Sequence, residues 1–319
     1  MCPIRGDNIL DTIIRTVIPI YLLIGLGFLS RRFKLLKLGD ERVLNGYVYF
    51  FALPALFFIN IAGINFTHDT LRFVLAAISP IFVVLVIYSL LYRICRLSKD
   101  MFYLLTLSTI FGSLGFFGIP FVMFAFPTTD GEHLAILSAS FISVVSVSTS
   151  LILLETYKLE QGRMWRNTIR VLNKLSKNPL ILSILCGVIV SVVGLTLPSP
   201  LQTTVHMLGK TTSTVAIYML GVFLYGRRYT ELGTALKIST LRMVFLPTIA
   251  LLIIKFLFKL PSMEQSVLVL MHNMPVAISM IVLSQRYDFH KETMASVILV
   301  SSIGAGVYLN IWIFILQYL

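Results

Sequence analysis

The chain has 319 residues, of which 57% are hydrophobic and only 13% charged, and its formal net charge is +12. Soluble domains carry about a quarter charged residues, so this composition excludes a soluble enzyme or nucleic-acid-binding protein. Apolar runs of about twenty residues, the length that crosses a bilayer as a helix, recur from end to end. The sequence therefore predicts an all-α polytopic membrane protein whose surroundings are the lipid bilayer.

The hydropathy pattern predicts ten transmembrane helices in chain order. They cover residues 9–29, 43–63, 70–92, 101–126, 133–155, 179–197, 203–225, 238–258, 264–284 and 292–317. Five alternate loops hold 20 of the 26 Lys and Arg residues, and the basic side of a membrane protein faces the cytoplasm. We therefore expect a multi-pass protein of the cytoplasmic membrane with both termini outside.

Prolines recur at matching places in the two halves of the chain. Pro19 in "IPIYLLIGLGF" matches Pro179 in "NPLILSILCGV", and Pro120 in "GIPF" matches Pro275 in "NMPV". Five spans in each half is an odd number, so the second half enters the membrane from the opposite side. This is the inverted repeat of many secondary transporters.

The repeat sets the expected domain boundaries. Residues 1–157 form the first five-span repeat, residues 158–178 a cytoplasmic linker, and residues 179–319 the inverted repeat. The linker contains "WRNTIRVLNKL", which is compatible with a basic amphipathic helix at the headgroups or with a solvated connector.

Spans 4 and 9 carry the residues that interrupt helices. Span 4 reads "FGSLGFFGIPF", where Gly115 permits unusual backbone angles and Pro120 removes a hydrogen-bond donor. Span 9 reads "MHNMPVAISM", with Pro275 in the same role. Two broken helices that cross would present positive helix ends and free N–H groups to one small volume, which favours an anion such as a carboxylate. The alternative for the glycines is close helix packing.

Polar residues near these breaks are candidate ligand contacts. Asn273 can donate and accept hydrogen bonds, His272 is an ionisable residue within a predicted span, and the serines of span 5 share one helical face. The candidate substrate-binding residues are Ser113, Gly115, Pro120, Ser143, His272, Asn273 and Pro275. Asn60 and Asn310 are interpreted as hydrogen-bond contacts between helices. The three cysteines are scattered, so we expect no disulfide framework, no metal site and no cofactor.

Several of these motifs are similar to one known family. "LNGYVYFFALPALFF", "FGSLGFFGIPFVMFAF", "NPLILSILCGVIVSVVGLTLP" and "HNMPVAISMIVLSQRYDFHKETMASVILVSS" resemble segments of the auxin efflux carrier family, in the order and spacing of its bacterial members. The family usually has Asn where this chain has Ser113, and Pro where it has Thr214.

The resemblance implies a mechanism as well as a fold. It implies crossed spans 4 and 9, and an elevator in which a transport domain (spans 3–5 and 8–10) slides along a scaffold (spans 1, 2, 6 and 7). It also implies small organic anions as substrates and homodimers formed through the scaffold.

The expected function is therefore that of a secondary transporter, a permease or efflux carrier. A channel or a non-transporting sensor on the same fold is the alternative. An intramembrane enzyme is disfavoured, because "FGSLG" places Phe111 where a nucleophile elbow needs Gly.

Overall fold

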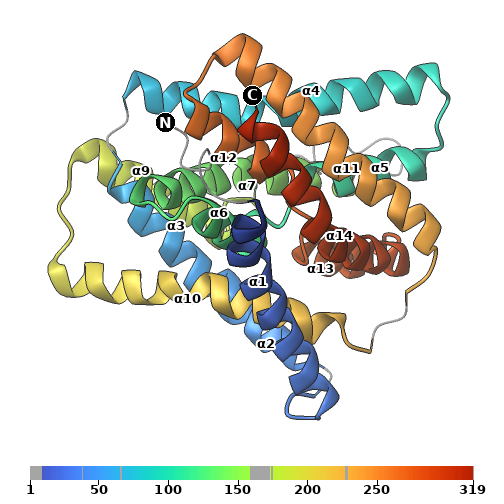
Figure 1. Ribbon diagram of the computed structural model, residues 1–319, viewed down its shortest axis with the longest axis horizontal. Helices are drawn as coiled ribbons and strands as arrows, with labels where there is room; N and C mark the ends of the chain where they lie inside the picture. The colour runs from blue at the N-terminus through green and yellow to red at the C-terminus, as the bar shows by residue number, and fades with distance from the viewer. Residues whose placement is uncertain are drawn as a thin grey trace.

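The computed structural model describes residues 9–37, 39–64, 67–158, 173, 175–226 and 229–318, and these form an all-helical bundle without a named strand. In the order of Figure 1 the elements, with η for π-helical segments, are α1 (Ile9–Arg32), α2 (Asp40–Tyr47), η1 (Val48–Ala52), α3 (Leu53–Ala62), α4 (His68–Ile94), α5 (Lys99–Ile110), η2 (Leu114–Gly118), α6 (Ile119–Ala125), α7 (Thr129–Tyr157), α9 (Pro179–Val193), α10 (Ser199–Leu224), α11 (Leu232–Leu252), η3 (Ile253–Phe258), α12 (Ser262–His272), α13 (Ser279–Tyr287) and α14 (Lys291–Gln317).

Within the described part of the chain, six helices are long and apolar enough to cross a membrane. They are Asp40–Ala62, His68–Ile94, Thr129–Tyr157, Ser199–Leu224, Leu232–Phe258 and Lys291–Gln317. Two shorter apolar helices, Leu114–Ala125 and Pro179–Val193, lie among them. Every apolar segment expected from the sequence coincides with one of the helices or with an interrupted pair of them. Most of the predicted linker, including the basic amphipathic segment, lies outside the described residues.

Side-chain caps define where several helices begin. Thr67, Ser98 and Thr128 precede α4, α5 and α7, and each hydroxyl accepts a hydrogen bond from a backbone N–H of the first turn. Asn178 does the same for α9, with its Oδ1 3.0 Å from the Leu180 nitrogen. Such caps satisfy N–H groups that a helix cannot pair by itself, so the short polar residues between apolar runs fix the span starts.

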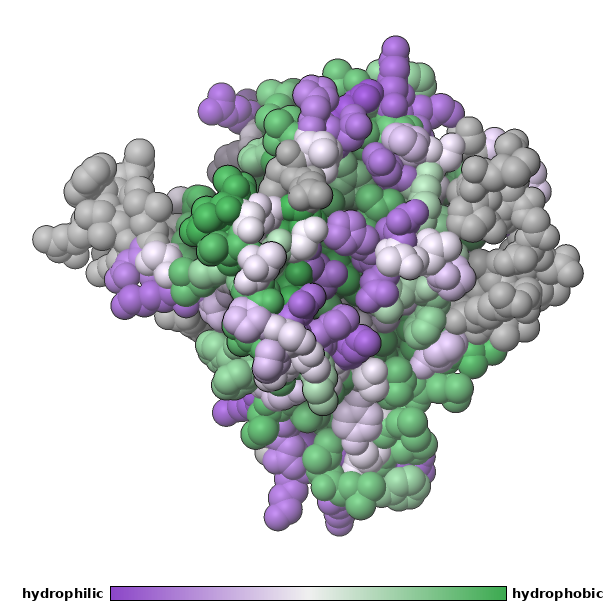
Figure 2. Space-filling model, turned by 90° about the vertical axis from the view of Figure 1, so that its left-hand side faces the viewer, coloured by the Kyte–Doolittle hydropathy of each residue, from purple (hydrophilic) through white to green (hydrophobic). Residues whose placement is uncertain are grey.

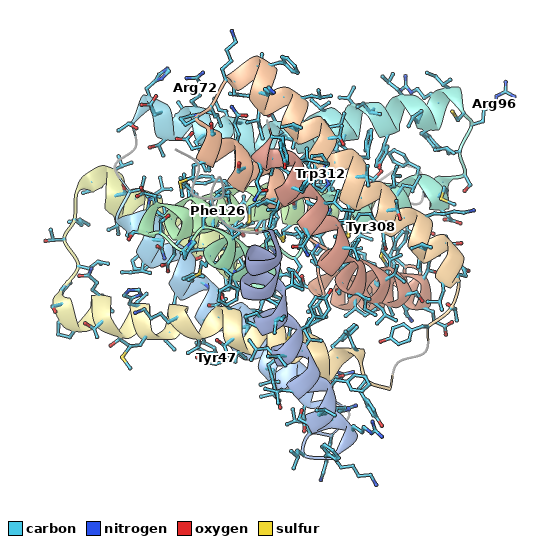
Figure 3. The ribbon with its side chains drawn as sticks, in the orientation of Figure 1. Tyr47, Arg72, Arg96, Phe126, Tyr308 and Trp312 are labelled. Carbon is cyan, nitrogen blue, oxygen red and sulfur yellow. The ribbon has the colours of Figure 1, made fainter. Side chains whose placement is uncertain are left out.

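The helices pack in two groups with the interrupted segments between them. In Figure 1, α3 and α10 lie on the left and α2 at the bottom centre, whereas α4 runs across the top and α5 and α11 lie on the right, with α6 and α7 between them. α1 packs along α10, α3 along α9, and α11 along α14. Two side chains hydrogen-bond the last pair (Figure 3): Tyr308 to the Thr240 hydroxyl at 2.8 Å, and Trp312 to the Met243 carbonyl at 3.0 Å.

The outer surface exposes many large apolar side chains, among them Leu22, Phe51, Val86, Val192 and Val307. Figure 2 shows broad apolar areas on one face of the molecule, with polar residues between them. A soluble monomer rarely exposes apolar patches of more than a few hundred Å². The surface therefore suits a hydrocarbon environment.

Candidate functional site

Both interruptions expected in spans 4 and 9 are present, and they face each other. α5 ends at Ile110 and η2 begins at Leu114, while α12 ends at His272 and α13 begins at Ser279. The extended segments between them, residues 111–113 and 275–277, run antiparallel and form an isolated bridge; we call them the crossover. The Ser113 N–H donates to the Pro275 carbonyl at 2.8 Å, and the Ala277 N–H donates to the Phe111 carbonyl at 3.0 Å. Each interrupted helix thus supplies hydrogen-bond partners for backbone groups that the other leaves unpaired. Backbone groups inside a membrane need such partners, because lipid offers none.

The first break does not lie at the proline that predicted it. The chain leaves the helix at Phe111, whereas Pro120 is buried near the start of α6, which continues η2 in one apolar helix, Leu114–Ala125. Proline inside a helix removes a backbone hydrogen bond, and the π-helical segment η2 lies directly before it. Pro275 does lie inside its break, where its carbonyl accepts the bond from Ser113.

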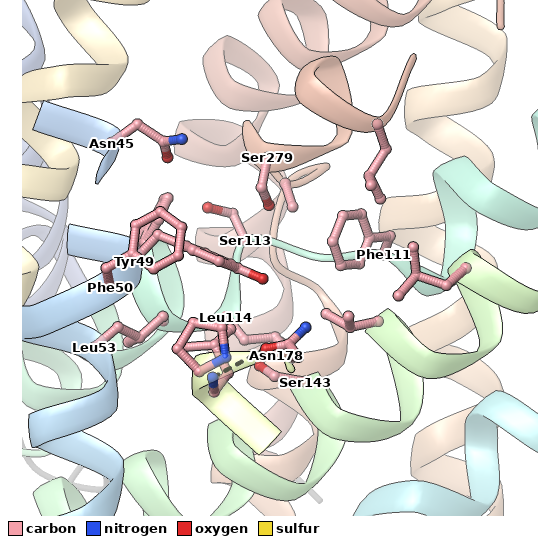
Figure 4. Close-up of a pocket in the computed structure, with 18 of the residues that line it drawn as sticks. Asn45, Tyr49, Phe50, Leu53, Phe111, Ser113, Leu114, Ser143, Asn178 and Ser279 are labelled. Carbon is pink, nitrogen blue, oxygen red and sulfur yellow. Dashed lines mark hydrogen bonds between the residues drawn. The ribbon is translucent and has the colours of Figure 1, made fainter. Parts of the chain in front are cut away.

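A cavity of about 580 Å³ opens beside the crossover (Figure 4). Its wall combines both sides of the crossover with α7, the span formed by α2, η1 and α3, and the start of α9. The lining residues are Asn45, Tyr49, Phe50, Leu53, Phe111, Gly112, Ser113, Leu114, Gly115, Phe116, Ser143, Val147, Leu151, Asn173, Lys177, Asn178, Pro179, Leu180, Ala277, Ser279 and Leu283. This volume suits a small molecule.

Two helix N-termini and three hydroxyl groups meet at this cavity. η2 begins at Leu114 and α13 at Ser279, and both residues line the wall. The first N–H groups of a helix have no acceptor within the helix, and the end carries about half a positive charge. At α13 the Met280 and Ile281 N–H groups already donate to the Ala277 and Ile278 carbonyls, so this end acts chiefly through its potential and the Ser279 hydroxyl. Ser113, Ser143 and Ser279 place their hydroxyl groups around the same space (Figure 4). The cavity therefore offers hydrogen-bond donors and positive potential, the combination that binds an anion.

The structure brings only part of the predicted site together. Ser113, Gly115 and Ser143 line the cavity, whereas Pro120, His272, Asn273 and Pro275 do not. His272 is 1% exposed, and its Nε2 lies 2.9 Å from the Ala77 carbonyl on α4. Asn273 is fully buried, and both polar atoms of its amide lack a partner among the described residues.

The polarity of the broken helices explains this division. His272 and Asn273 precede the second break, at the carboxyl end of α12, where carbonyl groups and negative potential gather. Residues after each break stand at helix N-termini, which is where the cavity lies. The candidates from "HNMP" therefore lie on the side of the break where α12 ends, away from the cavity, and Ser279 on the other side contributes a hydroxyl to the cavity wall.

Three further polar residues of the spans bond their own helices. The Ser140 hydroxyl on α7 donates to the Ile136 carbonyl at 2.7 Å. Asn60 donates to the Leu56 carbonyl at 2.8 Å, and Asn310 donates to the Gly306 carbonyl. The interpretation of Asn60 and Asn310 as contacts between helices is wrong, because each amide bonds the carbonyl four residues back in its own helix.

Several cavity residues were not predicted as site residues. Asn45 belongs to the "LNGYVYFF" motif, and its amide oxygen is buried without a partner among the described residues. Tyr49 interacts with the Asn178 side chain across the cavity wall. Lys177 is exposed and is the one charged side chain among the described lining residues. Lys177 was counted among the basic loop residues that predict the orientation in the membrane, so it was not predicted to line the cavity.

A buried arginine beneath the crossover was also missed. Arg242 was counted among the basic loop residues although the predicted span 238–258 also includes it, and in the structure it lies within α11 and is 1% exposed. Its Nε donates to the Met274 carbonyl at 2.7 Å, and its Nη1 donates to the Thr109 carbonyl and, at 3.5 Å, to that of Ser108. The count was misleading because α11 begins at Leu232, so Arg242 lies in the interior of the helix and not before it.

A bundle with two interrupted, paired helices and a cavity beside them, lined by apolar residues and a few polar groups, has the architecture of a membrane carrier. The chain matches the family described as membrane transport protein over residues 12–313, and it belongs to this family, the auxin efflux carrier family. It is 23% identical over 305 residues to the uncharacterized transporter YfdV of Escherichia coli K12, covering 94% of this chain and 96% of that protein. It is 25% identical over 312 residues to the uncharacterized transporter MJ1031 of Methanocaldococcus jannaschii, covering 94% and 97%. The resemblance inferred from the motifs is confirmed.

Proposed function

We propose that this protein is a secondary carrier that moves a small organic anion, a carboxylate, across the cytoplasmic membrane. The observation that carries the proposal is the meeting of two helix N-termini at one cavity, together with the Ser113, Ser143 and Ser279 hydroxyl groups. A carboxylate has two oxygens, and each can accept bonds from N–H and O–H donors. The two helix ends together supply about one positive charge, which matches one carboxylate.

The packing of the helices supports a five-plus-five inverted repeat. In such a repeat α1 corresponds to α9 and the span formed by α2, η1 and α3 corresponds to α10. α1 packs on α10, and its counterpart α9 packs on α3. In the same way α4 packs on α7, and the corresponding α11 packs on α14. Reciprocal pairs of this kind are expected when two halves are related by a two-fold axis.

We assign the same helices to two moving parts. α1, the α2–α3 span, α9 and α10 form the scaffold, and the remaining spans with the crossover form the transport domain. The cavity lies where the two parts meet, because Tyr49 and Asn178 come from the scaffold and Ser113 and Ser279 from the transport domain. A site shared in this way supports an elevator mechanism, in which one part carries the ligand past the other.

The cavity opens on the side of the basic loops. Asn45 lies near the start of α2, after the loop that holds Lys34 and Lys37, and Lys177 lies just before α9. With these loops in the cytoplasm, this conformation faces inward, and Lys177 stands at the entrance used by a cytoplasmic anion.

The test is transport by the purified protein in proteoliposomes. Monocarboxylates, dicarboxylates and aromatic acids are loaded singly, and counterflow of the same radiolabelled acid is measured. A carrier gives saturable, stereoselective counterflow. A channel gives anion current without counterflow, and a sensor binds an acid without moving it; either result contradicts the proposal.

Serine variants link that activity to the cavity. Ser143→Ala removes a hydroxyl that lines the cavity, and its matched control Ser140→Ala removes one that bonds its own helix. We expect Ser143→Ala and Ser279→Ala to weaken binding about ten-fold each, the effect of about 1.4 kcal/mol. Ser140→Ala should bind like the parent. Ser113→Asn, which introduces the residue usual in the family, should change substrate preference more than stability.

A further inference from the structure

Arg242 is a fully buried cation whose acceptors are backbone carbonyls. The guanidinium contacts the Ser108 and Thr109 carbonyls at the end of α5 and the Met274 carbonyl just after α12. No carboxylate of the described residues forms an ion pair with it. Burial of a charge without a partner is costly, so these carbonyls must supply the compensation.

The groups around Arg242 are uncharged or bonded elsewhere. Tyr88 of α4 stacks on Phe245, and its hydroxyl is 3.0 Å from the Thr109 hydroxyl. His272 of α12 turns its Nε2 to the Ala77 carbonyl. Gly112 of the crossover leaves the space for the guanidinium, because a Cβ there would collide with Nη2. The surroundings of Arg242 therefore fit a cation in two ways: Gly112 leaves space for the guanidinium, and the backbone carbonyls accept its hydrogen bonds.

The helix ends account for the charge. The carboxyl ends of α5 and α12 each carry about half a negative charge, and together they match one guanidinium. In carriers with broken helices, carbonyls at such helix ends and in the unwound segments coordinate the inorganic cation that drives transport. Here a protein side chain already fills that position.

We propose that Arg242 is the resident cation of the crossover: it occupies the place of a coupling ion, holds the two breaks together, and makes transport independent of sodium. The inference about coupling rests on the proposed carrier function, whereas occupation of the carbonyl site by the guanidinium does not. Arg242 is a positioning residue, because it lies behind the crossover and does not line the cavity.

Thermal unfolding of the purified full-length protein tests the occupation. Wild type should unfold at the same temperature in sodium, potassium and choline chloride of equal ionic strength. Arg242→Ala vacates the carbonyls, so its Tm should fall in choline chloride and rise again in sodium chloride or in guanidinium chloride at concentrations too low to denature. Arg242→Lys keeps the charge but loses the planar fork, so its Tm should lie between those of wild type and Arg242→Ala without preference for a cation.

Arg72 provides the matched control. Its guanidinium also contacts carbonyls at a helix end, those of Phe258 and Lys259, but at a partly exposed site. Arg72→Ala should show no cation-dependent recovery, because water can reach the vacated carbonyls. Equal recovery of the Arg72 and Arg242 variants, or an Arg242→Ala variant as stable as wild type in choline chloride, would overturn the proposal.

Transport by wild type tests the coupling without any variant. Counterflow of the accepted acid should have the same initial rate in sodium, potassium and choline chloride. An inward sodium gradient that drives accumulation of the acid would overturn the proposal. If no acid shows counterflow, the carrier function fails, and the thermal measurements still decide whether Arg242 occupies the carbonyl site.

Discussion

Gly27 and Gly221 lie at the crossing of α1 and α10, and each makes room for the backbone of the other helix. A Cβ added at Gly27 would lie 3.0 Å from the Val222 nitrogen and still closer to the Tyr218 carbonyl oxygen. A Cβ at Gly221 would lie 2.8 Å from the Ile24 carbonyl carbon. Because the obstacles are backbone atoms, neither helix can yield by turning a side chain. This crossing joins the two halves of the chain inside the proposed scaffold.

Alanine at either glycine should therefore destabilise the protein. We expect Gly27→Ala and Gly221→Ala to cost about 1–3 kcal/mol each, the usual penalty for overpacking. Gly25→Ala is the matched control on the same helix, since a Cβ there meets no atom within 4 Å. Unfolding in detergent measures the effect, and equal stability of the Gly25 and Gly27 variants would contradict the tight crossing.

The contact between Gly112 and Arg242 predicts a coupled pair. Gly112→Ala should lower stability, because the new methyl group meets a guanidinium fixed by three carbonyls. In an Arg242→Ala background the same change should cost much less, so the two effects should not add. Additive losses in a double-mutant cycle would argue that the two sites are independent. Gly46→Ala, at a position with open space, serves as the control.

The Tyr21 hydroxyl connects α1 to α14 across the boundary between the proposed scaffold and transport domain. It donates to the Ile303 carbonyl at 2.7 Å and accepts the Gly306 N–H at 3.0 Å. These bonds must break when one part slides past the other. Tyr21→Phe should therefore speed the exchange of conformations and raise the counterflow rate, at a stability cost of about 1 kcal/mol per lost bond.

Tyr47→Phe is the comparison for Tyr21→Phe. The Tyr47 hydroxyl bonds the Thr211 hydroxyl at 2.8 Å, and both residues belong to the proposed scaffold. Its loss should lower stability without changing the rate of counterflow. A similar rate change in both variants would argue against a sliding boundary between α1 and α14.

Lys177 should raise the affinity for anions through its charge. Lys177→Gln should weaken apparent affinity at low ionic strength, and the difference from wild type should shrink as salt is added, because exposed charges are screened within about 10 Å at 0.1 M. Lys237→Gln, an exposed lysine on α11 outside the cavity lining, should behave like wild type. Binding titrations at several salt concentrations measure this, and a salt-independent loss would indicate a structural role instead.

The interruptions could be predicted from the sequence because their cause is local. Glycine and proline weaken a helix wherever they stand, so "FGSLGFFGIP" and "NMPV" marked the right spans even though Pro120 itself lies within the resumed helix Leu114–Ala125. Ser113 and Gly115 followed directly, since they lie at the N-terminal side of the resumed helix. Hydropathy found the spans for a similar reason, because each apolar run is contiguous.

The other cavity residues could not be predicted, because their positions depend on how the helices pack against one another. Asn273 and Ser279 are six positions apart, yet one ends buried behind the break and the other faces the cavity. Lys177 and Asn45 reach the cavity only through the packing of α9 and α2. Arg242 looked like a loop cation, because nothing in "ISTLRMVF" reveals the carbonyls that receive it.

The fixed charge of Arg242 makes the empty and loaded carriers respond differently to the membrane potential. In the proposed elevator, an empty transport domain would carry this positive charge through the field, worth up to about 2.3 kcal/mol per 100 mV, whereas a bound monovalent anion would cancel it. With the proposed orientation, a potential that is negative inside would draw the empty carrier to its inward-facing state and leave the loaded carrier free to move. The empty site would then face the cytoplasm, and the voltage would favour export of the proposed anion.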